Sequence, residues 1–389
     1  MAQRNPERFN RNVAIDRGLF EEALGYCIEK TRQNSAVFVD QVPASASKNL
    51  VYEAIDNTYW TASFWCGMLW LAYEATGEAT FRQVAERQLK LHQNRLDQKV
   101  NIDTHDLGFL YSLSCVAGYR LTGNTAARDY AVRAAAHLSG RYLEKPQVIQ
   151  AWGKLDDPEK KGQMIMDCLF NLPLLYWTTE VTGDRKYHQM AYNHAKQAAR
   201  LLVRPDNSSF HTYFLDVETG EPLIGKTHQG FADDSTWARG QAWGIYGFPL
   251  SYRYTRDWTL IETAVRMTEY FLAHLPDDEI CYWDLVFTAG TEERDSSAAA
   301  LAVCGILEMC KYFPMTHPDK RRFENAAVVI LESLTKDYLT KNHPESNGIL
   351  LHGVQHKPKK LGVDECCIWG DYYYFEAILR VLRDWKPYW

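Results

Sequence analysis

The sequence of 389 residues lacks the segments that carry a protein into or across a membrane. Its longest clean apolar run, Ala298–Leu307, is far shorter than the roughly 20 residues that a transmembrane helix needs. Residues 1–10 contain no apolar stretch of the kind that a secretory signal requires. The nine cysteines, an odd number placed mostly among apolar neighbours, indicate reduced thiols rather than disulfides. We therefore expect a cytoplasmic protein with no membrane partner.

Basic residues and cofactor motifs are also in short supply. The 43 Lys and Arg residues against 49 Asp and Glu give a net charge of -6 without any basic run, which argues against a nucleic-acid partner. His352 and His356 lie four residues apart, yet no His-Glu-x-x-His or Cys-x-x-Cys motif accompanies them, so no metal site is predicted. Gly240, Gly244 and Gly247 follow neither dinucleotide nor Walker spacing. What remains is acid-base chemistry without a cofactor.

A weak internal repeat is present instead. Tyr73–Gly77, Tyr119–Gly123, Thr179–Gly183 and Tyr252–Arg256 each follow a segment that is apolar nearly all round and precede an amphipathic one. The glycine that ends the first three fits the left-handed position after a helix. Each unit therefore predicts one buried helix and one helix with a solvent-exposed face.

Two further units complete the pattern. One runs from Asp295 to Phe313 with a partner from Phe323 onward, and the other is Trp369–Trp385, whose expected partner is the N-terminal helix. Six such pairs predict an all-α, single-domain (α/α)6 barrel over residues 1–389, with six inner and six outer helices and an irregular segment at residues 1–15. An open solenoid is the competing architecture, but solenoid repeats are usually shorter and more regular.

Two aspartates, Asp106 and Asp167, each begin a strongly apolar segment. A carboxylate among apolar neighbours is costly to keep charged, so it is either hydrogen-bonded or carries a raised pKa that suits a proton donor. The alternative for each residue is a helix N-cap. Apolar residues flank Asp167 on both sides, whereas Asp106 follows polar residues; we expect Asp106 to be better solvated and to ionise first. The helix N-terminus opposes these shifts, so the sign of the net change is a hypothesis.

If the inner helices share one polarity, their N-terminal ends gather at one mouth of the barrel. Tryptophans, carboxylates, histidines and amides occupy these positions, a mixture typical of a sugar-binding surface. Arg239 is a candidate for gripping a substrate carboxylate, and a structural ion pair with a neighbouring Asp is its alternative. The connection from Arg204 to Ala238 is too long for a mere link, so we expect it to be functional and to contain a short hairpin near residues 210–223.

At these residues the chain resembles the unsaturated glucuronyl hydrolases, glycoside hydrolase family 88, from about Asn49 to the C-terminus. The segments that carry the resemblance are Asp56–Trp60, His105–Ser112, Gln150–Gly153, Asp167–Leu175, Ser209–Thr212, Thr236–Gly247, Arg294–Ser297 and Ile368–Tyr374. The resemblance implies the same barrel and no cofactor. It also implies a hydrolase that releases the 4,5-unsaturated uronic acid from the non-reducing end of lyase-generated chondroitin or hyaluronan oligosaccharides, so unsaturated di- and oligosaccharides are the expected partners.

The resemblance further implies a mechanism, in which an acid protonates C4 of the vinyl ether, water adds at C5, and the hemiketal opens. Asp167 would be the general acid and base, with Asp106 as its supporting carboxylate. The implied substrate-binding residues are Trp60, His105, Trp152, His211, Gln229, Arg239 and Trp243. Where relatives that favour sulfated substrates carry Ser-x-x-Ser-x-Lys, this chain has residues 355–361 instead. The possible sulfate or specificity residues there are His356, Lys357, Lys359 and Lys360, although lysines on a loop are more often simply solvated.

Two other classes of function remain open from the sequence. An unsaturated rhamnogalacturonyl hydrolase would share the barrel and a similar pair of aspartates but act on pectin fragments. A non-catalytic scaffold or sugar-binding protein would use the two aspartates only as helix caps. The oligomeric state and the preference for sulfated or unsulfated sugars are not predicted.

Overall fold

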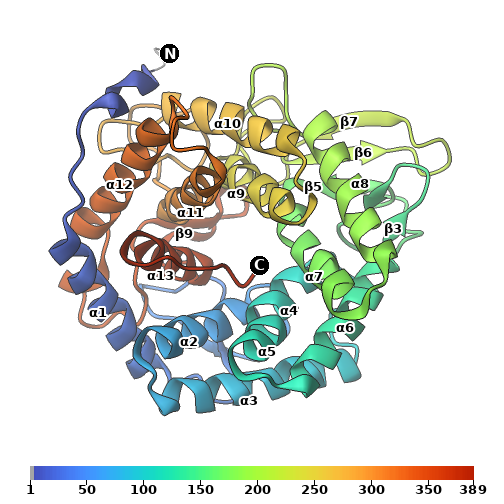
Figure 1. Cartoon of the computed structure of the whole chain (residues 1–389), viewed down its shortest axis with the longest axis horizontal. Coiled ribbons are helices and arrows are strands. Elements are labelled where there is room, and N and C mark those ends of the chain that lie inside the picture. The colour runs from blue at the N-terminus through green and yellow to red at the C-terminus, as the bar shows by residue number, and fades with distance from the viewer. Residues whose placement is uncertain (1–3) are drawn as a thin grey trace.

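The computed structural model describes residues 4–389. In this part of the chain twelve helical members form a closed ring, six on the inside and six on the outside (Figure 1). The inner members are α2 (Ala62–Thr76), α4 (Leu107–Tyr111) continued by α5 (Ala117–Thr122), α7 (Leu172–Thr182), α9 (Ala238–Thr255), α11 (Ser296–Tyr312) and α13 (Ile368–Leu382). The outer members are α1 (Arg17–Asn34), α3 (Ala79–Asp97), α6 (Thr125–Ser139), α8 (Arg185–Leu201), α10 (Trp258–Ala273) and α12 (Lys320–Asp337). The ring is closed because α13 packs against α2. The predicted (α/α)6 barrel is confirmed, and the open solenoid is wrong.

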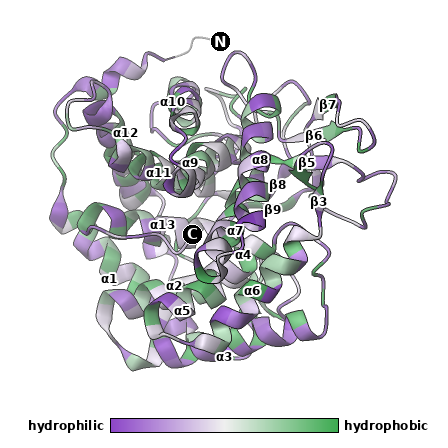
Figure 2. Cartoon of the chain, turned by 45° about the vertical axis from the view of Figure 1, so that its right-hand side comes forward, coloured by the Kyte–Doolittle hydropathy of each residue, from purple (hydrophilic) through white to green (hydrophobic). Residues whose placement is uncertain are grey.

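The glycine-ended repeat marks the inner helices as expected. Gly77, Gly123 and Gly183 end α2, α5 and α7 with φ between 73° and 76°, a conformation that a residue without Cβ adopts at no steric cost. Arg256 takes the same left-handed position after α9, with φ 59°. The outer helix α3 alternates hydrophilic and hydrophobic residues along its length (Figure 2), as a helix with one face in water must.

Two of the inner helical members contain irregular turns. Between α4 and α5 the chain forms one π-helical stretch, Ser112–Val116. The helix α7 is preceded by a 3-10 helix, Met166–Phe170. Insertions of this kind in a helix often accompany functional sites, because they re-aim the side chains nearby. Asp106 comes directly before α4, and Asp167 lies within the 3-10 helix.

The loops at the mouth of the barrel contain short antiparallel strands. They are β1 (Val42–Pro43) with β2 (Ala54–Ile55), β3 (Tyr142–Leu143) with β4 (Val148–Ile149), β5 (Gln163–Ile165) with β6 (Thr212–Leu215) and β7 (Pro222–Lys226), and β8 (Gly353–His356) with β9 (Leu361–Glu365). The hairpin predicted in the long connection is β6–β7, and β5 extends it to three strands. Since β5 runs directly into the 3-10 helix, the sheet fixes the approach to Asp167.

The N-terminal segment wraps along the outside of the ring. Residues 1–3 of the segment predicted to be irregular lie outside the described residues. From residue 4 to the start of α1 the chain forms a single 3-10 helix, Pro6–Asn10. Phe9 of this helix is buried, and the side chain of Asn325 on α12 donates to the carbonyls of Phe9 and Arg11. Within residues 4–389 no helix combines the length and apolarity that crossing a membrane would require.

The centre of the ring is filled from the end opposite the mouth. Trp389 lies there (Figure 1) and is 1% exposed. Its ring stacks on Tyr373 and meets Phe170 and Phe109 edge-on, with centroids 5.0 Å and 5.9 Å away. The interior of the barrel is therefore a packed core that is open at one end only, and the aromatic rings below the mouth are closely packed.

A buried charge network joins three inner helices. Arg380 on α13 donates to Glu376 at 2.9 Å and to Glu308 on α11 at 2.7 Å, and it also contacts the hydroxyl of Tyr246 on α9. The side chains of Arg380 and Glu376 have no exposed surface, and that of Glu308 is 2% exposed. Charges so far from water are tolerated only as a complete set.

Replacing Arg380 with methionine is expected to lower the free energy of unfolding by about 3–5 kcal/mol, because two buried glutamates lose their counter-ion. Chemical denaturation followed by circular dichroism measures the change. The matched control is Arg82→Met, which removes an exposed ion pair with Glu86 and is expected to leave the free energy of unfolding nearly unchanged. Equal losses in the two variants would contradict a structural role for the network.

Candidate active site

A pocket of about 200 Å³ opens at the mouth of the barrel. It brings together side chains from the loops before five of the six inner helices. Its lining residues are Trp60, Asp106, Trp152, Asp167, His228, Gln229, Arg239, Gln355 and His356. Both aspartates singled out in the sequence thus face one small cavity, where flat rings, amides and an arginine surround them.

Asp106 occupies the position before α4 but makes no capping hydrogen bond to that helix. Instead its Oδ2 accepts a 2.6 Å hydrogen bond from the hydroxyl of Thr104, and its Oδ1 lies 3.3 Å from Nε2 of His105. Burial raises the pKa of Asp106 to about 6, and the Thr104 hydrogen bond together with Arg95 and Arg141 limits the rise. Asp106 thus stands at the N-cap position of α4 but does not cap the helix with its side chain.

Asp167 is the second residue of the 3-10 helix Met166–Phe170, whose N-cap is Ile165, so it is not a cap either. Its Oδ1 is buried without a hydrogen-bond partner among residues 4–389. Burial raises the pKa of Asp167 to about 7, the charge of Arg239 opposes this, and the charge of Asp106 adds to it. Asp167 also lines the pocket, so its carboxyl group can meet a ligand there.

The order of ionisation agrees with the prediction, but the predicted reason is wrong. The side chains of Asp106 and Asp167 are nearly equally exposed, at 12% and 14%. Asp106 is therefore not better solvated. The hydrogen bond from the Thr104 hydroxyl lowers the pKa of Asp106, whereas the charge of Asp106 raises the pKa of Asp167.

His211 is held next to Asp167 in one protonation state. Its Nδ1 accepts hydrogen bonds from the backbone N–H groups of His228 and Gln229, at 3.0 Å and 3.2 Å. The ring hydrogen must therefore be on Nε2, which lies 3.9 Å from Oδ1 of Asp167. Burial lowers the pKa of His211 well below its usual value, so the ring stays neutral and can only donate toward the carboxyl group.

Arg239 lies between two indole rings, with its guanidinium carbon 4.3 Å from the centroid of Trp237 and 4.8 Å from that of Trp369. It pairs with Asp295 at 3.1 Å and donates to the carbonyl of Gln355 at 2.7 Å. The ion pair that the sequence left open as the alternative is thus present. Arg239 on α9 is therefore hydrogen-bonded to β8, and it also contributes a positive charge to the wall of the pocket.

The structure places the other predicted substrate-binding residues at different depths. Trp60, Trp152 and Gln229 line the pocket. His105 is buried behind Asp106, with its ring edge-on to Trp152. Trp243 does not line the pocket, and its prediction as a substrate-binding residue is corrected here. Trp243 lies one helical turn below Arg239 and is fully buried. The centroid of its ring is 4.7 Å from that of Phe170, 5.3 Å from that of Phe109 and 5.8 Å from that of Tyr373.

Two lining residues, His228 and Gln355, were not among the predicted substrate-binding residues. His228 lies 5.0 Å from the ring of Trp152 and 5.1 Å from that of His356, so these three rings form one wall. Gln355 lines the pocket beside His356, and its carbonyl accepts hydrogen bonds from both Gln229 and Arg239. The sequence offered a signal for His228, because this residue is next to the predicted Gln229. It offered no signal for Gln355, because the register of a strand brings that residue to the mouth.

The hairpin β8–β9 carries the four residues predicted as a sulfate or specificity loop. His356 faces the pocket. Lys357 forms an ion pair with Glu293, which holds it away from the cavity. Lys359 and Lys360 lie exposed at the turn, Lys360 with φ 54°. Of the three lysines, therefore, only the last two are free to meet a ligand from solvent.

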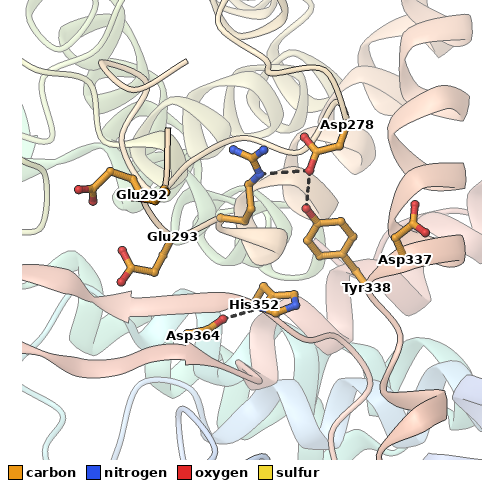
Figure 3. Close-up of a pocket in the computed structure, with 9 residues that line it drawn as sticks. Asp278, Glu292, Glu293, Asp337, Tyr338, His352 and Asp364 are labelled. Carbon is orange, nitrogen blue, oxygen red and sulfur yellow. Dashed lines mark hydrogen bonds and ion pairs between the residues drawn. The ribbon is translucent and has the colours of Figure 1, made fainter. Parts of the chain in front are cut away.

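A second, open pocket of about 470 Å³ lies behind this hairpin (Figure 3). Several of its polar groups pair with one another: Asp278 accepts from Arg294 at 3.1 Å and from the hydroxyl of Tyr338 at 2.7 Å, and His352 contacts Asp364. The pocket is rich in carboxylates, which repel an anionic sugar. Among residues 4–389 no three His, Cys, Asp or Glu side chains group so as to hold a metal ion.

Gly108 and Asn171 hold the two aspartates in fixed relation. A Cβ atom on Gly108 would lie 2.1 Å from the Cα of Asn171, so the backbones touch as only glycine allows. The side-chain oxygen of Asn171 accepts the backbone N–H of Phe109 at 2.8 Å. Asp106 lies two residues before Gly108, and Asp167 lies four before Asn171.

Comparison with known proteins gives one consistent picture. Residues 34–374 match the model of Glycosyl Hydrolase Family 88. The unsaturated chondroitin disaccharide hydrolase of Streptococcus agalactiae is 46% identical over 386 residues, covering 99% of this chain and 97% of that protein. A crystal structure of the unsaturated glucuronyl hydrolase from that species superposes with a TM-score of 0.96 at 45% identity, covering 100% and 98% of the two chains. An aspartate-to-asparagine variant of that enzyme, crystallised with dGlcA-GalNAc6S, superposes with a TM-score of 0.88 at 43% identity, again covering 100% and 98%.

The raised pKa of Asp167 predicts that the site destabilises the fold as pH rises. An unfolded Asp titrates near 3.9, so between about pH 4 and 7 the folded chain holds a proton that the unfolded chain has lost, and stability falls across this window. Asp167→Asn, a neutral isostere, is expected to be more stable than the wild type at pH 8 by on the order of 2 kcal/mol, and by less at pH 5. Denaturant unfolding at both pH values measures this, with Asp156→Asn, at an exposed position, as control. A variant gain that is the same at pH 5 and pH 8 would contradict the assignment.

Proposed function

The chain belongs to Glycosyl Hydrolase Family 88 and is an unsaturated glucuronyl hydrolase, and from this premise we propose its substrate and the roles of its residues. The substrate is an oligosaccharide of chondroitin or hyaluronan type that begins with the 4,5-unsaturated uronic acid left by a polysaccharide lyase. The reaction adds water across the C4=C5 double bond, and the hydrated ring then opens and releases the neighbouring sugar. The similarity to a chondroitin disaccharide hydrolase over nearly the whole chain supports this class.

The observation that carries the proposal is the pair of carboxyl groups facing one pocket with pKa values of about 6 and about 7. At neutral pH Asp106 is mostly ionised while much of Asp167 keeps its proton. A protonated carboxylic acid next to a carboxylate is the arrangement that acid catalysis of an alkene needs.

Asp167 acts first as an acid in this proposal. It gives its proton to C4, and positive charge develops at C5 and the ring oxygen, where the carboxylate of Asp106 stabilises it. The Asp167 carboxylate then takes a proton from the water that attacks C5. The hemiketal formed at C5 opens, and the neighbouring sugar leaves from C1. Asp167 has its proton again at the end, so the cycle consumes only water.

Neutral groups orient the ring. His211, with its hydrogen on Nε2, faces the carboxyl group of Asp167 and favours its ionised form after the proton has left. Trp60 and Trp152 offer flat surfaces to the sugar, and Arg239 supplies the positive charge at the wall for the uronate carboxylate. His228 and His356 complete the wall as neutral rings, since burial lowers the pKa of each to about 4.

The two rival classes have no comparable support. The relatives compared above are glucuronyl and chondroitin disaccharide hydrolases, so nothing favours a pectin fragment. A scaffold that used the aspartates as caps is inconsistent with both side chains, because neither caps a helix. For location we propose the cytoplasm: all nine cysteines are unpaired and buried, as suits a reducing compartment.

The wild type is expected to erase the ultraviolet absorbance of the double bond in an unsaturated chondroitin disaccharide, without added metal or cofactor. Asp167→Asn is expected to lower kcat by about 10³-fold, within the range for a lost general acid. The Asp156→Asn variant is the matched control and should stay within about twofold of the wild type. An Asp167→Asn variant with normal turnover would rule out the role given to this residue.

The pH dependence of kcat/KM is expected to be bell-shaped, with an acid limb near pH 6 and an alkaline limb near pH 7. Activity falls below the first because Asp106 becomes neutral, and above the second because Asp167 loses its proton; the apparent values belong to the coupled pair. In Asp106→Asn the residual activity should lack the acid limb, and its alkaline limb should move to lower pH because the neighbouring charge is gone. A profile that is flat from pH 5 to 9 would contradict the assignment.

A further inference from the structure

The catalytic pocket is too small for an oligosaccharide. Its volume of about 200 Å³ is below the roughly 300–1,000 Å³ of pockets that enclose drug-sized ligands, so it holds one sugar ring. The rest of the substrate must leave across the surface at the mouth. Two surfaces flank the pocket there: the β8–β9 hairpin, and a groove between residues 58–60 and residues 99–104.

This groove is continuous with the catalytic pocket. It has a volume of about 540 Å³ and shares two of its lining residues, Trp60 and Asp106, with the smaller cavity. Thr104, the residue that donates to Asp106, lies in the groove as well. A chain whose first ring reaches the two aspartates therefore meets the groove at Trp60 and Asp106.

Buried Arg95 holds the two sides of the groove in place. It is 3% exposed and donates to the carbonyls of Thr58 and Tyr59 on one side and of Val100 and Asn101 on the other, at 2.7–3.1 Å. Because all these donors point into the protein, Arg95 shapes the groove and does not itself bind a ligand. A surface fixed in advance loses little entropy when it binds.

The groove exposes two side chains suited to an acidic sugar. Tyr59 is 53% exposed, and its ring has no partner ring among residues 4–389. Lys99 is exposed with φ 56°, and its ammonium group has no hydrogen-bond or ion-pair partner in the described part of the chain. The neighbouring carboxylate of Asp103 contacts His137 at 3.3 Å. A flat ring and a free cation that line the same groove fit the face and the charge of a uronate or a sulfated sugar.

We propose that this groove binds the leaving side of substrates longer than a disaccharide. Tyr59 covers the face of a sugar beyond the first two, and Lys99 pairs with the carboxylate or sulfate of such a sugar. The inference rests on the proposed function, since it places further sugars of the same substrate. It makes the enzyme one that acts on longer lyase products, with a preference built into the loops before α2 and α4.

The test compares kcat/KM for an unsaturated disaccharide and for the tetrasaccharide with the same first two sugars. Tyr59→Ala and Lys99→Ala are each expected to lower the value for the tetrasaccharide by about tenfold and to leave the disaccharide within twofold. The effect of Lys99→Ala should shrink as salt is added, because an exposed charge pair is screened. An unsulfated hyaluronan tetrasaccharide and a sulfated chondroitin tetrasaccharide separate the two sources of negative charge: a loss with both assigns Lys99 to the carboxylate, and a loss with the sulfated one alone assigns it to the sulfate.

The matched control replaces Lys359 and Lys360 on the other flank with alanine, and no change in the tetrasaccharide to disaccharide ratio is expected. If this control loses tetrasaccharide activity while Tyr59→Ala and Lys99→Ala do not, the leaving sugars follow the hairpin and the inference is wrong. Equal losses on both substrates in the groove variants would also overturn it. A wild type that consumes no disaccharide would instead refute the proposed function, so the two failures are distinguishable.

Discussion

The close approach of Gly108 to Asn171 is the constraint on which the rest of the site depends. The two aspartates belong to different helix pairs, and nothing in their own hydrogen bonds joins them. Their relative position is set by a backbone contact that has no space for a Cβ atom, and by the hydrogen bond from the Phe109 N–H to the Asn171 side chain. Phe109 also stacks on Phe170, with rings 5.7 Å apart and nearly parallel. Acid and carboxylate are thus placed by core packing, which is stiff, rather than by surface loops, which are not.

The electrostatics of the site follow from how the nearby cations are engaged. Arg239 already pairs with Asp295, and Arg95 donates to loop carbonyls. Each of these charges is close enough to lower a carboxyl pKa, yet neither forms an ion pair with Asp106 or Asp167, so burial remains the largest cause of both shifts. A direct ion pair would have held an aspartate ionised and unable to donate a proton. The arginines therefore build the walls and leave the carboxyl groups titratable.

Much of this architecture could be predicted from the sequence, because it rests on local signals. The glycine-ended repeat marked the inner helices, and the apolar setting of Asp106 and Asp167 marked the acids. What failed depended on contacts distant in sequence. Trp243 shares a helix face with Arg239, but one turn along the axis is about 5.4 Å, enough to move a side chain from the pocket into the core.

The ion pair of Lys357 and the burial of Asp106 were not predicted for the same reason. The ion pair of Lys357 is with Glu293, 64 residues earlier, and no local pattern announces it. Asp106 has polar neighbours in sequence, yet the fold covers them, so polarity along the chain did not mean contact with water. The π-helical stretch after α4 likewise has no signal in the residues that form it.

The nine buried sulfhydryl groups give the molecule an intrinsic probe of local opening. All are shielded from solvent, and they are spread over the outer helix α1, the inner elements from α2 to α11 and the segment leading into α13. Burial also raises the pKa of thiols such as Cys66, Cys168 and Cys304, so in the native protein they are poor nucleophiles. An alkylating reagent can therefore modify each one only when its own part of the ring opens. Peptide mapping of the modified sites over time would then reveal which helix pairs separate first, with no label introduced.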